Sequence, residues 1–161
     1  MNILGIDPGY AIVGFGVINY NGNLFKTLGY GCITTPVNLD MSKRLFIIYD
    51  ELQQIILKYK PSCLAVEKLY FVSNQKTAIS VAQARGIILL SGAKNNLPIF
   101  EYTPLQIKQS VTGYGRATKS QIIAMISSML KLSFAPKLDD TADALAVAIC
   151  HAHSCKSLFL K

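Results

Sequence analysis

The sequence predicts an α/β fold, in which a mixed five-stranded sheet is flanked by helices on both faces. Residues 2–7 and 62–67 are short, almost wholly apolar runs, which are typical of strands buried on both sides. The turn signal Asn21-Gly22-Asn23 separates two strand-like segments and indicates a hairpin. Strand-like and helical segments then alternate, which favours parallel crossovers. A length of 161 residues suits one domain.

The first half of the chain supplies most of the sheet. The expected strands are Asn2–Asp7, Gly14–Asn19, Leu24–Thr34, Ser62–Glu67 and Leu97–Tyr102. A helix over 42–59, capped by Ser42 or Asp40, places apolar residues at helical spacing on one side. The next helix, over 75–93, is apolar nearly all round in its second half. Such a helix is covered on both sides, so we expect the core on one side and a second subunit on the other.

Three helices complete the chain. Thr103 and Pro104 start a short helix that runs to Val111, and Gly113-Tyr114-Gly115 breaks the chain after it. Thr118 caps a helix to about Leu132, and the last helix starts near Asp139. The predicted element order is therefore β-β-β-α-β-α-β-α-α-α.

The charge of the chain is unevenly distributed. The net charge is +7, but residues 68–138 hold nine basic residues and one acid, a net charge of +8. A one-sided basic segment is typical of a protein that binds a polyanion, nucleic acid first. The alternative is a solvated face tuned for solubility.

Four of the nine acids stand in unusual places. Asp7 and Glu67 end two apolar strands, where a carboxylate needs an ion-pair partner or a metal. Asp140 and Asp143 are three residues apart, so they share a helix face just before the apolar run 144–149. Asp139 points elsewhere and is expected to cap the helix. Lys and Arg are sparse beside all four acids, which argues against a salt-bridge network.

Carboxylates without His or Cys favour hard cations, Mg²⁺ or Mn²⁺. Four acids can hold two such ions, an arrangement that clamps a scissile phosphate. The sequence therefore predicts a metal-dependent phosphodiesterase site.

The four cysteines, Cys32, Cys63, Cys150 and Cys155, lie in apolar stretches, and we expect reduced core thiols. The run Cys150 to Cys155 includes His151 and His153, but these side chains fan around a helix, so we expect partly exposed histidines rather than a zinc site. The first residues lack a basic region and a cleavage signal, and no apolar run would span a membrane. The expected location is the cytoplasm.

Five segments resemble bacterial RuvC, the Holliday junction resolvase family built on the ribonuclease H-like fold. They are "GIDPG" at 5–9, "AVEKLYF" at 65–71, "AQARG" at 82–86, "TGYGRATKSQI" at 112–122 and "DDTADALAVAICHAH" at 139–153. The resemblance implies a single ribonuclease H-like nuclease domain over 1–161, with the last few residues as a flexible tail. Actin-like ATPases start similarly, but they need a second phosphate-binding half for which this chain has no room.

The resemblance also implies roles for individual residues. Asp7, Glu67, Asp140 and Asp143 match the catalytic, metal-binding acids, with Mg²⁺ as cofactor, Mn²⁺ as a substitute and two ions per site. Lys108 and Lys119 match basic residues that face the DNA backbone, although an ordinary surface lysine is the alternative for Lys119. Gly113 and Gly115 match a DNA-facing turn.

Tyr70 matches an aromatic residue that stacks on or wedges between bases near the junction centre. Phe71 is a rival for that role, and a core ring is the other reading of Tyr70.

The implied function is resolution of four-way DNA junctions by paired symmetric nicks during recombination and repair, which leave 5′-phosphate and 3′-hydroxyl ends. The implied partners are junction DNA, a second copy of the chain in a homodimer, and a branch-migration motor complex of the RuvA/RuvB type. Two alternatives stay open: a related nuclease acting on RNA:DNA hybrids or damaged DNA, and a junction-binding protein without catalysis.

Overall fold

The computed structural model describes residues 1–22, 24–69, 75–132 and 139–158 of the chain. Ten helices and strands follow one another in these ranges, in the predicted order. They are β1 (Asn2–Asp7), β2 (Ile12–Asn21), β3 (Leu24–Thr34), α1 (Met41–Tyr59), β4 (Cys63–Glu67), α2 (Gln75–Lys94), β5 (Ile99–Tyr102), α3 (Pro104–Thr112), α4 (Lys119–Met129) and α5 (Asp139–Leu158). The predicted C-terminal tail falls mostly on residues 159–161, outside the described residues.

The five strands form one mixed sheet in the order β3-β2-β1-β4-β5. β1, β2 and β3 pair antiparallel, and Asn21 pairs with Leu24 at the predicted hairpin turn. β4 pairs parallel with β1 on one side and with β5 on the other. β1 and β4 are therefore neighbours in the middle of the sheet. Because they run parallel, their carboxyl ends lie side by side.

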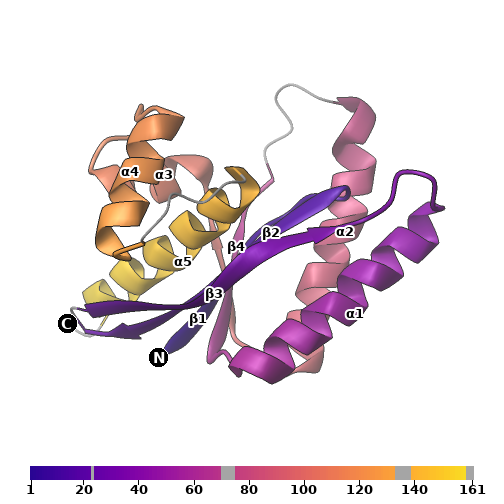
Figure 1. Ribbon diagram of the computed structural model, residues 1–161, viewed down its shortest axis with the longest axis horizontal. Helices are drawn as coiled ribbons and strands as arrows, with labels where there is room; N and C mark the ends of the chain where they lie inside the picture. The colour runs from indigo at the N-terminus through magenta and orange to yellow at the C-terminus, as the bar shows by residue number, and fades with distance from the viewer. Residues whose placement is uncertain (23, 70–74, 133–138, 159–161) are drawn as a thin grey trace.

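Helices cover both faces of the sheet (Figure 1). α1 and α2 pack together on one face, and α3, α4 and α5 lie on the other, which confirms the predicted α/β architecture. α5 is the central helix of its layer, because it contacts all five strands as well as α3 and α4.

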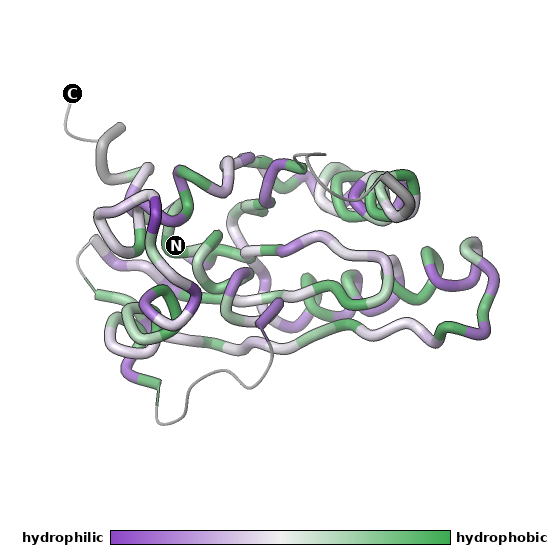
Figure 2. Tube along the Cα trace, turned by 90° about the horizontal axis from the view of Figure 1, so that it is seen from above, coloured by the Kyte–Doolittle hydropathy of each residue, from purple (hydrophilic) through white to green (hydrophobic). Residues whose placement is uncertain are grey.

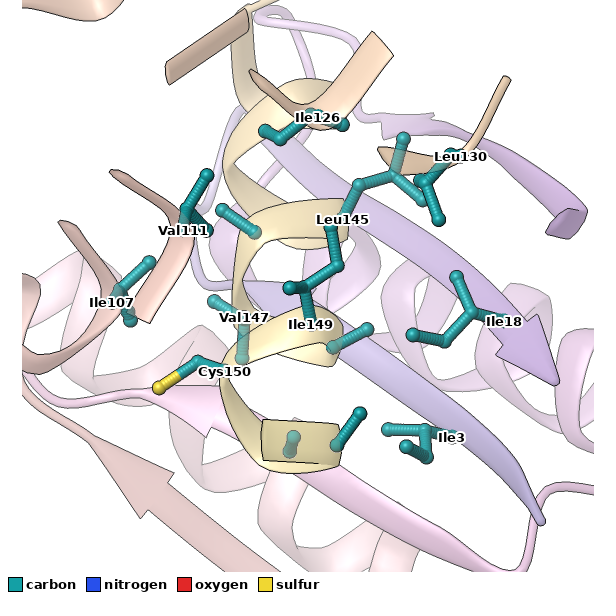
Figure 3. Close-up of a cluster of buried hydrophobic side chains, with 14 of the residues drawn as sticks. Ile3, Ile18, Ile107, Val111, Ile126, Leu130, Leu145, Val147, Ile149 and Cys150 are labelled. Atoms are coloured by element: carbon teal, nitrogen blue, oxygen red, sulfur yellow. The ribbon is translucent and has the colours of Figure 1, made fainter. Parts of the chain in front are cut away.

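Each helix layer encloses its own core. Figure 3 shows the core around α5, in which Leu145 and Ile149 lie near Ile18, near Ile126 of α4 and near Leu130, which follows α4. The other core lies under α1 and α2 and includes Leu4, Ile48, Leu64 and Ile88. Burying large aliphatic side chains contributes roughly 1.5–3 kcal/mol each to stability. These two cores therefore fix the helices against the two faces of the sheet.

Several predicted bounds differ from the structure. β2 is longer than predicted at both ends, and β5 begins at Ile99 rather than Leu97. α1 begins at Met41, after Asp40, whose side chain makes no capping hydrogen bond. α4 ends at Met129, because Leu130 closes the helix and Lys131 has a positive φ of 50°. Thr103 and Thr118 both form capping boxes, which confirms those two predicted helix starts.

The histidine prediction is wrong for His151. Its side chain is 1% exposed and packs against the rings of Phe100 and Tyr102, because β5 packs against α5 there. The Tyr102 hydroxyl lies 2.7 Å from its Nδ1. The four cysteines are free thiols, of which Cys63 and Cys150 are buried and Cys32 and Cys155 half-buried.

No helix among the described residues is long and apolar enough to cross a membrane, and hydrophilic residues recur along the helices (Figure 2).

Candidate active site

Asp7 and Glu67 end neighbouring parallel strands, so the sheet itself brings their side chains together. Ile6 pairs with Val66 in the β1–β4 register, and the next residue on each strand is the acid. The two half-buried side chains share a hydrogen bond. In α/β sheets, functional groups gather at the carboxyl ends of parallel strands, and this pair lies at such a place.

α5 crosses the sheet at the same edge and adds two more carboxylates. Gly14, the β2 partner of Asp7, lies against the start of this helix. A Cβ atom at Gly14 would lie 2.0 Å from the carbonyl oxygen of Asp140, and one at Gly5 would lie 2.3 Å from that of Ala144. Only glycine permits such a close approach of backbone to backbone. The helix can therefore place Asp140 and Asp143 near Asp7.

The acid cluster raises the pKa of two of its members, Asp7 and Glu67. Burial, followed by the charges of the other three acids, raises the pKa of Asp7 to about 8. Burial and the charge of Asp143 likewise raise the pKa of Glu67. Like charges in a partly buried site disfavour ionisation of one another. Without a cation, this environment therefore favours the protonated form of Asp7.

A lysine far away in sequence reaches this cluster. Lys119, the first residue of α4, places its Nζ 3.1 Å from an oxygen of Asp143 and 3.2 Å from one of Asp139. Burial alone would lower the pKa of Lys119, but these two carboxylates outweigh it and the net shift is upward. The prediction that basic residues are sparse beside the acids is wrong, because Lys119 contacts Asp143 and Lys108 lines the same cavity as Glu67.

Asp139 itself lies within the first turn of α5 and is an ion-pair partner of Lys119 rather than the predicted cap of the helix.

A cavity of about 310 Å³ opens beside the acids. Lys108 and Lys119 line it together with Glu67 and Asp143, and apolar side chains form the remaining wall: Pro104, Ile107, Ile122 and Ala146. Sequence reasoning missed this apolar wall, because its residues follow the ordinary spacing of core positions in three separate helices. The cavity combines acids, cations and a water-excluding surface, as a site for phosphodiester chemistry requires.

Comparison with known proteins identifies the family. The family model for crossover junction endodeoxyribonuclease RuvC matches residues 3–151. The RuvC of Alkaliphilus oremlandii is 59% identical over 154 residues, which cover 96% of this chain and 94% of that protein. This chain belongs to the RuvC family.

Solved RuvC structures agree with that assignment. Thermus thermophilus RuvC in complex with a Holliday junction substrate superimposes with a TM-score of 0.93 at 29% identity, covering 98% of this chain and 96% of that one. The yeast mitochondrial Holliday junction resolvase shares the fold, with a TM-score of 0.67 at 14% identity.

The donor set of this RuvC-family site suits a hard divalent cation. Its ligand atoms would be carboxylate oxygens, and the raised pKa of Asp7 indicates clustered negative charge that such a cation would neutralise. Within the described ranges, however, no group of three or more His, Cys, Asp or Glu side chains is arranged to hold a metal ion. The four carboxylates have the oxygen donors that a divalent cation needs. To bind one ion together, their side chains must come closer to one another.

The structure describes some, but not all, of the residues that are expected to contact DNA. Gly113 ends α3 with a positive φ of 73°, and Gly115 follows it in the turn before α4. Lys108 is half-buried on α3 and lines the cavity. Tyr70, with its rival Phe71, lies outside the described residues.

Proposed function

We propose that this RuvC-family chain resolves four-way DNA junctions through a divalent-metal site made by Asp7, Glu67, Asp140 and Asp143. The observation that carries the proposal is that Asp7 lies close enough to the other three acids for their charges to raise its pKa, and that two of these acids, Glu67 and Asp143, line a cavity with two lysines. The similarity to a RuvC bound to a Holliday junction substrate supports four-way DNA as the ligand.

The four acids would hold Mg²⁺, with Mn²⁺ as a substitute, and two ions per site fit the number of carboxylates. When bound, the metal supplies activation of a water molecule and neutralisation of the leaving oxygen. The acids fix the site on rigid elements, because two of them end central strands and two stand on the central helix. Ile107 and Ile122 keep bulk water away from one side of the cavity.

The lysines would position the DNA strand. Lys108 and Lys119 line the cavity, where they can pair with phosphate oxygens on either side of the scissile bond. In the reaction, a water oxygen forms a bond to phosphorus and the bond from phosphorus to the 3′ oxygen breaks. The products are a 5′-phosphate and a 3′-hydroxyl. The turn with Gly113 and Gly115 is proposed to approach the DNA backbone.

A symmetric homodimer would present one site to each of the two equivalent strands of a junction. The exposed face of α2 is the proposed interface. Ile79 is 74% exposed and Leu90 is 54% exposed on this helix, while Ala84 and Ile88 face the core. Between the two exposed residues lies Gly86, where an added Cβ would meet nothing within 4 Å. Such a face can accept a helix of a second copy at close distance.

Two further expectations belong to the same proposal. We propose that the protein acts in the cytoplasm during recombination and repair, and that it cooperates with a branch-migration motor complex of the RuvA/RuvB type.

The direct test is strand cleavage with Mg²⁺ and with EDTA on three labelled substrates: a mobile four-way junction, a linear duplex and an RNA:DNA hybrid. We expect symmetric nicks on the junction alone, and none in EDTA. Cutting of the hybrid would move the function to a related ribonuclease H-like nuclease. Tight junction binding without cutting under any metal would leave a binding protein.

A further inference from the structure

Lys119 occupies a position that its own helix does not favour. It is the first residue of α4, where the helix dipole opposes a positive charge. The capping box of Thr118 and Gln121 fixes the backbone there, and the Lys119 side chain takes no part in it. The ammonium is held instead by carboxylates across the cavity, at 3.1 Å from Asp143 and 3.2 Å from Asp139.

This ion pair uses one of the four acids of the proposed metal site. A Mg²⁺ ligand oxygen lies about 2.0–2.1 Å from the ion, so a cation bound to Asp143 would stand close to the ammonium that now contacts the same carboxylate. The ion and the ammonium are both positive and would repel each other when they contact the same carboxylate. Metal binding to Asp143 therefore weakens its ion pair with Lys119.

The Lys119 side chain is also free to leave. It is 47% exposed, and the other oxygen partner, Asp139, is 68% exposed. The Asp143 side chain is 34% exposed, and ion pairs as open to solvent as these are weak. The contact between Lys119 and Asp143 can therefore compete with a weakly bound divalent ion. Because the contact is weak, the ion can also displace the lysine.

We propose that Lys119 is a built-in counter-cation, which neutralises Asp143 in the metal-free protein and must leave that carboxylate when a divalent cation binds. The inference rests on the proposed function, because it takes the four acids as the metal site. It adds that the lysine sets the metal affinity of the free protein, in addition to any contact with DNA.

Lys108 provides a matched control. It lines the same cavity, and its charge lowers the pKa of Glu67, as that of Lys119 does. In the described part of the chain it forms no ion pair with an acid of the cluster. Removing either lysine deletes one positive charge beside the acids, but only removal of Lys119 also frees a carboxylate.

The experiment measures Mn²⁺ binding to the free, full-length protein, without DNA, by the loss of the electron paramagnetic resonance signal of the aquo ion. The proteins compared are the wild type, Lys119→Met, Lys119→Arg, Lys108→Met and Asp7→Asn, at one pH and one ionic strength. We expect Lys119→Met to bind Mn²⁺ about fivefold tighter than the wild type, as loss of a competing ion pair implies. Lys108→Met should change the affinity less than about twofold, because screened charge alone has a small effect. Lys119→Arg should bind no tighter than the wild type.

Equal affinities for Lys119→Met and Lys108→Met would overturn the inference and leave the proposed metal site intact. Unchanged Mn²⁺ binding by Asp7→Asn, or no binding by the wild type, would overturn the metal site itself and the inference with it. Thermal unfolding of each variant checks that the fold is retained.

Discussion

Gly14 of β2 lies in direct contact with the backbone of Asp140, so that a Cβ at this position would lie 2.0 Å from the Asp140 carbonyl oxygen. Gly14 is also the register partner of Asp7. One residue without a side chain therefore sets the spacing between a strand acid and a helix acid.

Gly14→Ala should disable the site by moving α5 away from the sheet. The added methyl group meets backbone, which cannot turn aside, so we expect a loss of about 1–3 kcal/mol in the free energy of unfolding. A displacement of about 1 Å can cost roughly a hundredfold in rate. Urea unfolding and junction cleavage measure the two effects. An unchanged free energy of unfolding together with unchanged cleavage would contradict the argument.

Asp7→Asn should abolish junction cutting while it preserves junction binding. The substitution removes a proposed metal ligand from the acid cluster and leaves the basic residues that are proposed to contact DNA unchanged. Cleavage assays in Mg²⁺ and gel-shift assays in EDTA, on the same labelled junction, separate the two effects. Normal cutting by this variant would refute the assignment of the site.

The metal-free protein should lose stability as the pH rises from about 4 to about 8. The pKa of Asp7 is raised from 3.8 to about 8 in the folded chain, so over this range the folded state holds a proton that the unfolded state releases. The free energy of unfolding therefore falls with pH. Urea unfolding in EDTA at pH 5 and pH 8 should give a smaller difference for Asp7→Asn than for the wild type, by roughly 1–3 kcal/mol. The same pH dependence in both proteins would exclude Asp7 as its source.

Leu90→Glu should convert the protein to a monomer. The substitution places a charge on the α2 face proposed as the dimer interface, and charges are depleted at interface centres. Sedimentation would measure the assembly state, and junction cleavage should change from paired nicks to single ones. Leu57→Glu is the matched control, because Leu57 is 75% exposed on α1. A dimer that survives Leu90→Glu, or that Leu57→Glu also disrupts, would argue against this interface.

Tyr70→Ala should weaken junction opening or cleavage and leave the fold intact, if the ring stacks on bases near the junction centre. Fluorescence of a base analogue placed at that centre, compared with Phe71→Ala, would decide which ring acts there. Unfolding of Tyr70→Ala would instead assign the ring to the core.

The sheet could be predicted from the sequence, because its strands carry their own signals. The apolar runs that end in Asp7 and Glu67 and the Asn21-Gly22 turn depend on local patterns alone. The shared face of Asp140 and Asp143 follows in the same way from helical spacing.

The ion pair of Lys119 and the burial of His151 could not be predicted in that way. Lys119 reaches Asp143, 24 residues further along, only because α4 packs against α5. His151 is buried because the β5 residues Phe100 and Tyr102 lie against α5. Both contacts depend on how helices and strands dock, which side-chain periodicity does not encode.

The order of the acids along the chain has a consequence for folding. Asp140 and Asp143 stand on α5, the last helix, which also completes one of the two cores. During synthesis this helix leaves the ribosome after every strand that it must cover. A nascent or truncated chain therefore lacks half of the carboxylates and the helix that positions them. Docking of α5 is therefore the folding step that completes the proposed four-acid site.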